Sequence, residues 1–105
     1  MRGQDPDVTA EDELRSMRQQ LHIYEAVSTA AGDAHAVLDV LLDSSDPDAA
    51  RHALELRYGF TQEQAWAVIE VQLRRMTQSD RQKIAQRRDE LVSRVAALEA
   101  ELGHP

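Results

Sequence analysis

The sequence predicts an all-α protein of five helices, in which an antiparallel two-helix coiled-coil arm carries a small globular helical tip. Three observations predict this fold. Ala, Leu, Val, Glu, Gln and Arg dominate the 105 residues, and such residues lose little entropy in a helix. Apolar residues recur at heptad spacing near both ends of the chain, and helix start and stop signals fill the segment between them. No run alternates with the period of two that indicates a strand.

The first arm helix is expected over residues 8–31, after a disordered polar tail of residues 1–7. Its seam consists of four residues spaced three, four and three apart, which is the pattern of a coiled coil: Leu14, Met17, Leu21 and Tyr24. Gly32 followed by Asp33 predicts the break that ends this helix.

The tip is expected over residues 32–76. Its first helix contains the apolar run of residues 37–42, which is too dense for a single stripe and predicts burial on more than one side. Asp46 and Pro47 are the residues expected at the N-cap and first position of the next helix. Gly59 is expected to end that helix in a left-handed conformation.

A capping box of Thr61 and Gln64 begins the last helix of the tip. Five apolar residues share one face of this helix: Ala65, Val68, Ile69, Leu73 and Met76. Trp66 lies off that face, so we expect it at an interface rather than in the core.

The returning arm helix is expected over residues 77–102, capped by Thr77 with Asp80 and followed by a tail of residues 103–105. Its heptad positions are Ile84, Leu91, Val95, Leu98 and Leu102. One antiparallel register then pairs every layer of the arm and sets Tyr24 against Arg88. We expect the guanidinium to lie on the ring, and this single polar layer to fix the register.

Charge and composition exclude several classes of function. The net charge of −7 argues against avid binding to DNA, although residues 74–88 are basic. A weak DNA contact would use Arg74, Arg75, Arg81 and Lys83, but pairing with the acidic first half of the chain or solvation explains them more simply. The chain has no cysteine, its histidines lack metal-ligand spacing, and its glycines form no phosphate loop. We therefore expect no metal and no cofactor.

No segment has the length and apolarity of a membrane span or the apolar core of a signal peptide. We expect a cytoplasmic protein that does not bind membranes. An arm and tip of this size cannot bury every large apolar residue that the sequence contains. The candidate residues of a dimer interface are Trp66, Leu41, Leu42 and Val71.

Several blocks of the sequence resemble the exit-gate region of the gyrase and topoisomerase IV protein that carries the DNA-cleaving tyrosine, known in the family as the GyrA-type or A-type component. Residues 54–59 are similar to the family's L-x-x-R-F-G, residues 64–69 to its Q-A-x-A-I block, and residues 73–77 to its L-R-R-L-T. Residues 21–25 are similar to its L-H-I-L-E. Trp66 within the second block and Gln78-Ser79 after the third depart from the family pattern.

The resemblance implies that two long helices form an arm and that the tips of two copies meet as a DNA exit gate. The family's catalytic tyrosine lies in an R-R-T-x-Y context, which neither Tyr24 nor Tyr58 matches. We therefore expect a free-standing homodimerisation module without catalytic activity of its own. Two alternatives stay open: a regulatory partner that forms mixed dimers with the A-type component of a resident gyrase or topoisomerase IV, and a small nucleoid-associated DNA-binding protein.

Overall fold

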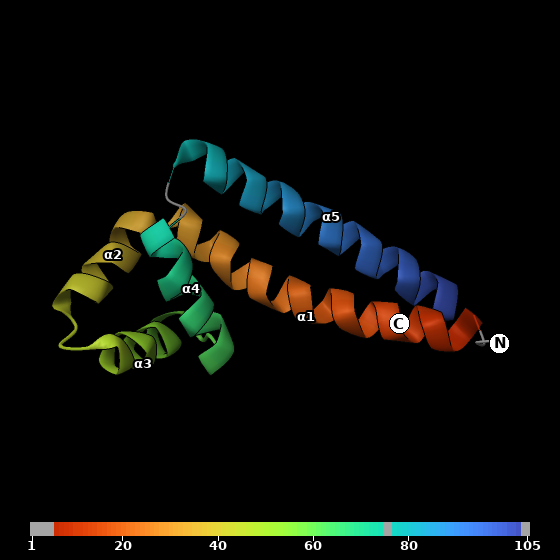
Figure 1. Ribbon diagram of the computed structural model, residues 1–105, viewed down its shortest axis with the longest axis horizontal. Coiled ribbons are helices and arrows are strands. Elements are labelled where there is room, and N and C mark those ends of the chain that lie inside the picture. The colour runs from red at the N-terminus through yellow and green to blue at the C-terminus, as the bar shows by residue number, and fades with distance from the viewer. Residues whose placement is uncertain (1–5, 75–76, 104–105) are drawn as a thin grey trace.

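The computed structural model describes residues 6–74 and 77–103, without the side chains of residues 6–8 and 72–74. These residues form five helices and no strand, which confirms the all-α prediction. The helices are α1 (Pro6–Gly32), α2 (Ala34–Asp43), α3 (Pro47–Tyr58), α4 (Gln62–Arg74) and α5 (Gln78–Leu102). The long helices α1 and α5 lie side by side and antiparallel, and α2, α3 and α4 gather at one end of the pair (Figure 1). We call α1 and α5 the arm, and α2 to α4 the tip.

Local capping interactions begin the helices where the sequence predicts them. The Asp46 carboxylate accepts a hydrogen bond from the Ala49 amide at 2.8 Å, and the Thr77 hydroxyl accepts one from the Asp80 amide at 3.1 Å. Gly59 ends α3 with φ of 72°, a conformation that costs glycine little because it has no Cβ. These boundaries follow from short-range chemistry alone.

The core of the tip is built partly by the arm. Val37 of α2 and Leu54 of α3 are fully buried. They share one apolar cluster with residues of α1, α4 and α5: Ala26, Val27, Ala30, Ala65, Val68 and Ile84. Because α1 contributes three of these residues, the tip packs directly on the end of α1, and α4 lies along it.

A second apolar cluster holds the free end of the arm together. Its buried members are Ala10, Leu14, Val95 and Leu98, and Met17, Leu21 and Leu102 pack against them. Polar pairs cross between the helices beside this cluster. Arg94 donates to Glu13 at 2.7 Å, Arg18 donates to Glu99 at 2.7 Å, and Arg87 donates to Gln20 at 3.0 Å.

Among residues 6–74 and 77–103, no helix is both long enough and apolar enough to cross a membrane.

Candidate functional site

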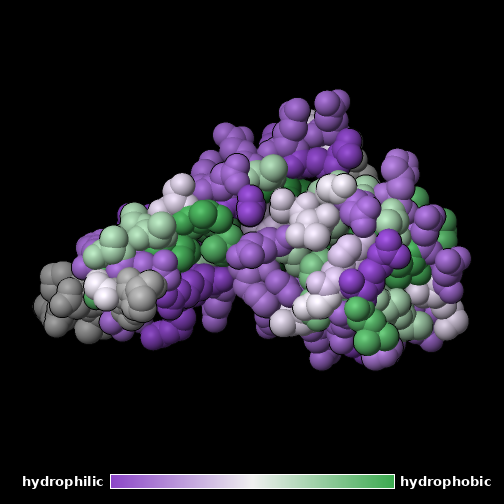
Figure 2. All heavy atoms as spheres, turned by 180° about the vertical axis from the view of Figure 1, so that it is seen from behind, coloured by the Kyte–Doolittle hydropathy of each residue, from purple (hydrophilic) through white to green (hydrophobic). Residues whose placement is uncertain are grey.

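The most exposed large apolar side chains belong to the tip. Leu42 of α2 and Leu56 of α3 are 73% and 74% exposed, and Leu38, one turn before Leu42, is 44% exposed. Figure 2 shows apolar side chains at the surface of the tip, among polar ones. We call Leu38, Leu42 and Leu56 the leucine patch. Clustered exposed leucines are typical of association surfaces.

The prediction that α2 is buried on more than one side is wrong within this chain. Val37 is fully buried and Leu41 packs against the tip core, but Leu38 and Leu42 face outward. The other helices of the tip cover only one side of α2, so its dense apolar run exceeds what one side can bury.

The four candidate interface residues occupy different environments. Leu41 and Val71 are partly buried against the tip core, whereas Leu42 is largely exposed. Trp66 is 36% exposed, and the guanidinium of Arg51 lies 5.9 Å from its ring centre. Arg51 also pairs with Glu55 and lies 3.9 Å from Asp48, so the Trp66 ring is partly covered by a charged cluster of its own chain.

Two residues of the leucine patch, Leu38 and Leu56, are not among the candidates that the sequence suggests. Leu38 and Leu41 belong to the same apolar run, and the sequence does not reveal which of them meets the rest of the tip. Leu56 stands alone between the charged residues Glu55 and Arg57, and a single exposed leucine carries no signal by itself. A helical projection of α3 places it opposite the buried Ala50 and Leu54, and only this signal could have found it.

A network of hydrogen bonds joins the tip to the arm. The Gln64 side-chain amide donates to the carbonyl oxygen of His22 at 2.7 Å and lies 3.2 Å from Nδ1 of the same residue. Nε2 of His22 lies 3.0 Å from the Thr61 hydroxyl. Thr61 and Gln64 also form the predicted capping box, in which Gln64 Oε1 accepts from the Thr61 amide at 2.9 Å and the Thr61 hydroxyl accepts from the Gln64 amide at 3.2 Å. The start of α4 is thereby fixed to the middle of α1.

These contacts also define the protonation of His22. Because the Gln64 amide nitrogen is turned toward Nδ1, that ring nitrogen accepts the hydrogen bond, and Nε2 donates to the Thr61 hydroxyl. We call this network of His22, Thr61 and Gln64 the joint.

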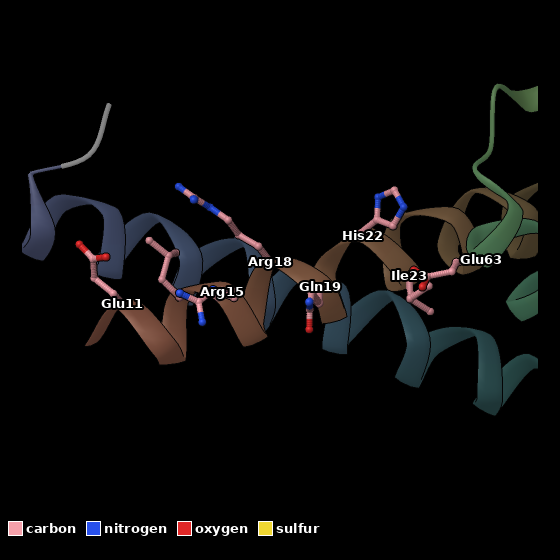
Figure 3. Close-up of a pocket in the computed structure, with 8 residues that line it drawn as sticks. Glu11, Arg15, Arg18, Gln19, His22, Ile23 and Glu63 are labelled. Carbon is pink, nitrogen blue, oxygen red and sulfur yellow. The ribbon is translucent and has the colours of Figure 1, made fainter. Parts of the chain in front are cut away.

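A hollow of about 550 Å³ runs beside the joint, along α1 (Figure 3). Arg15, Arg18 and His22 line it from α1, and Glu63 lines it from α4. Arg15 pairs with Asp12 at 3.3 Å and Arg18 with Glu99 at 2.7 Å. The lining therefore carries both signs of charge and does not single out a class of ligand.

Neither described tyrosine is arranged as a nucleophile. The Tyr58 hydroxyl donates to the Asp33 carboxylate at 2.7 Å and its ring stacks on Phe60 at 5.0 Å. Burial raises the pKa of Tyr58 above its ordinary value, and the bond to Asp33 raises it further. Tyr24 packs against the tip core and lines a small hollow beside Lys83 and Ile84 of α5.

The basic stretch is only partly available for DNA. Arg81 and Lys83 are exposed on the first turns of α5, whereas Arg87 donates to Gln20 and Glu90, and Arg88 is exposed and pairs with Asp89 at 3.1 Å. The side chains of Arg74 and Arg75 lie outside the described residues. In the part of the chain that the structure describes, no group of three or more His, Cys, Asp or Glu side chains is placed to hold a metal ion.

Comparison with known proteins identifies the family. Residues 8–105 match the model of the A-type component of DNA gyrase/topoisomerase IV. The corresponding DNA gyrase protein of Dehalogenimonas lykanthroporepellens is 31% identical over 93 residues, covering 89% of this chain and 11% of that protein. Those of Campylobacter jejuni and Halalkalibacterium halodurans are each 33% identical, over 83% and 84% of this chain and 10% and 11% of their own lengths. The chain thus spans about a tenth of the length of these relatives. It belongs to the family of the A-type component of DNA gyrase and topoisomerase IV.

Proposed function

We propose that this chain is a homodimerisation module, in which the tips of two copies meet through the leucine patch as in an exit gate. The observation that carries the proposal is the exposure of Leu42 and Leu56, at 73% and 74%, on adjoining helices of a chain of this family. A folded helix gains nothing by presenting two leucines to water, whereas a symmetric partner would bury them.

The size of the patch predicts a weak dimer. Leu38, Leu42 and Leu56 together expose roughly two whole leucine side chains per copy. Burying both sets would contribute about 6–12 kcal/mol, at about 1.5–3 kcal/mol for each side chain. Association itself costs about 4–15 kcal/mol. Because these ranges overlap, the groups around the patch, including Trp66, Leu41 and Val71, would decide how tightly two copies bind.

We propose further that the arm is an antiparallel coiled coil in the register that sets Tyr24 against Arg88. The polar pairs across the arm support this register. Glu13 and Arg94 each precede a seam residue, and so do Gln20 and Arg87, whereas Arg18 and Glu99 each follow one. Pairs of these two kinds flank opposite sides of an antiparallel seam, and they bracket layers that join Leu14 to Leu98 and Met17 to Val95.

We also propose that the chain does not cleave DNA by itself and that it acts in the cytoplasm. The hydroxyl of Tyr58 is engaged by Asp33, and the ring of Tyr24 packs against the tip core. Neither arrangement provides a free tyrosine beside a general base or a metal site.

A mixed dimer with the A-type component of a gyrase or topoisomerase IV is the second candidate. The relatedness over most of this chain favours it, since a homologous tip would present a similar face. If it is correct, the purified chain should bind the immobilised gyrase protein more tightly than it binds itself.

Sedimentation equilibrium tests the homodimer. From about 10 to 300 µM, the apparent mass should rise from 11.8 kDa toward twice that value, as a micromolar association requires. Leu38→Glu should abolish the rise, because it places a carboxylate in the patch. Val92→Glu is the matched control, since Val92 is 42% exposed, close to the 44% of Leu38, but lies on the arm. A mass of 11.8 kDa at every concentration would overturn the proposal.

Trp66→Ala separates the two parts of the candidate interface. A central tryptophan contributes about 2 kcal/mol or more to association, so the dissociation constant should rise about 30-fold if Trp66 meets the partner. An unchanged constant would confine the interface to the leucine patch and leave Trp66 with Arg51.

A further inference from the structure

The leucine patch has an acidic rim. Asp39 and Asp43 are exposed on the same side of α2 as Leu38 and Leu42, each one residue further along the chain. Asp46 and Asp48 are exposed at the start of α3, and the side chain of Asp48 is 81% exposed. Residues 33–58 contain six acidic residues against two arginines.

The two arginines do not balance the rim. Arg51 is partly buried and already pairs with Glu55 and Asp48 of its own helix. Arg57 is exposed, but its guanidinium lies against the Tyr58 ring, 5.6 Å from the ring centre, at the end of α3 far from Asp46 and Asp48. The surface around the leucines is therefore negatively charged.

A two-fold axis brings identical surfaces together, so each copy would meet the acidic rim of the other. We infer that the tip-to-tip dimer is limited by repulsion between these rims and that salt strengthens it. This inference rests on the proposed homodimer. It gives the association a dependence on ionic strength opposite to that of an interface held by ion pairs.

Screening sets the size of the effect. Exposed charges interact over about 10 Å at 0.1 M salt and about 3 Å at 1 M. Several carboxylates on each copy approach within that distance when the leucines meet. We expect the dissociation constant to fall about tenfold between 0.05 M and 0.5 M sodium chloride, a range over which repulsion between exposed charges is largely removed.

A competing arrangement predicts the opposite sign. The acidic tip of one copy could contact the exposed Arg81 and Lys83 at the start of α5 of another. Such a contact joins unlike surfaces, so it would weaken with salt and would continue beyond two copies.

The test is sedimentation equilibrium across the same salt range at pH 8. His35 and His52 are exposed on the tip helices, and histidine side chains are ordinarily neutral at this pH. The parent chain is compared with two double variants. Asp39→Asn with Asp43→Asn removes two charges from the rim. Asp12→Asn with Asp89→Asn removes two exposed charges from the arm and is the matched control.

The expected result is a tenfold fall in the dissociation constant for the parent and the control, and a fall of threefold or less for the rim variant, which should also bind more tightly at low salt. A dimer whose constant is unchanged or rises with salt would overturn the inference and leave the homodimer standing. A rim variant that keeps the full salt dependence would also overturn it. A monomer at all salt concentrations would remove the proposed homodimer itself.

Discussion

The joint between arm and tip gives a sharp prediction about stability. Replacing Gln64 by alanine removes three hydrogen bonds: two to His22 of α1, and one from the Thr61 amide that begins α4. Alanine keeps the helix propensity of this position high. Any loss of stability therefore reports the hydrogen bonds and the side-chain packing rather than the helix itself.

The magnitude follows from the number of bonds and their exposure. A hydrogen bond within a protein contributes about 0.5–1.5 kcal/mol net. Thr61 is exposed, so water would replace part of the lost capping interaction. We expect Gln64→Ala to lower the free energy of unfolding by about 2 kcal/mol, which lowers the melting temperature by roughly 8 °C in a domain of about 100 residues.

Thermal unfolding followed by circular dichroism, at one low protein concentration, measures this change. Gln86→Ala on the exposed face of α5 is the matched control and should change stability by less than about 0.5 kcal/mol. In a double-mutant cycle with His22→Ala, the coupling energy should be about 1 kcal/mol or more. If Gln64→Ala is as stable as Gln86→Ala, or if the cycle shows no coupling, the joint does not fasten the tip to the arm.

Two further predictions concern Tyr58 and the register of the arm. The pKa of Tyr58 is raised in the folded chain, so its contribution to stability is fully present below about pH 10, the ordinary pKa of tyrosine, and is lost as the pH rises through the folded pKa. Tyr58→Phe should therefore be about 1 kcal/mol less stable than the parent at pH 8 in urea unfolding, with a difference that shrinks above pH 10; a constant difference would contradict the reasoning. For the register, Tyr24→Cys with Arg88→Cys should oxidise to an intramolecular disulfide, because the chain has no cysteine of its own and one layer brings the two Cα atoms close. Tyr24→Cys with Val95→Cys, two turns away, should not, and the reverse outcome would show the register to be wrong.

The features that depend on neighbours in sequence could be predicted from the sequence. The caps at Asp46, Thr61 and Thr77 and the stop at Gly59 each involve groups at most four residues apart, and the structure has all of them. The all-α class follows from the same local signals. Residue type and spacing determine such interactions without reference to the rest of the fold.

The features that depend on the packing of distant helices could not be predicted. His22 and Gln64 are separated by 42 residues, and the capping box accounts for Gln64 in the sequence without any contact to α1. On α2, Leu38, Leu41 and Leu42 are chemically alike, and only the position of the neighbouring helices exposes the first and last of them. The sequence therefore predicts the exposed leucines only in part.

The shared helix α1 determines how a force on the tip would travel. Among the described residues, α5 packs along α1, and the tip is fastened to α1 through the apolar cluster and the joint. Pulling two tips apart would therefore load α1 first, and α5 only through the seam and through Ile84. An unbroken helix of 27 residues, about 40 Å long, resists bending and stretching far more than a loop would. Rotation of the tip relative to the arm would require either bending of α1 near its end or opening of the joint, so these two places are where the molecule would yield.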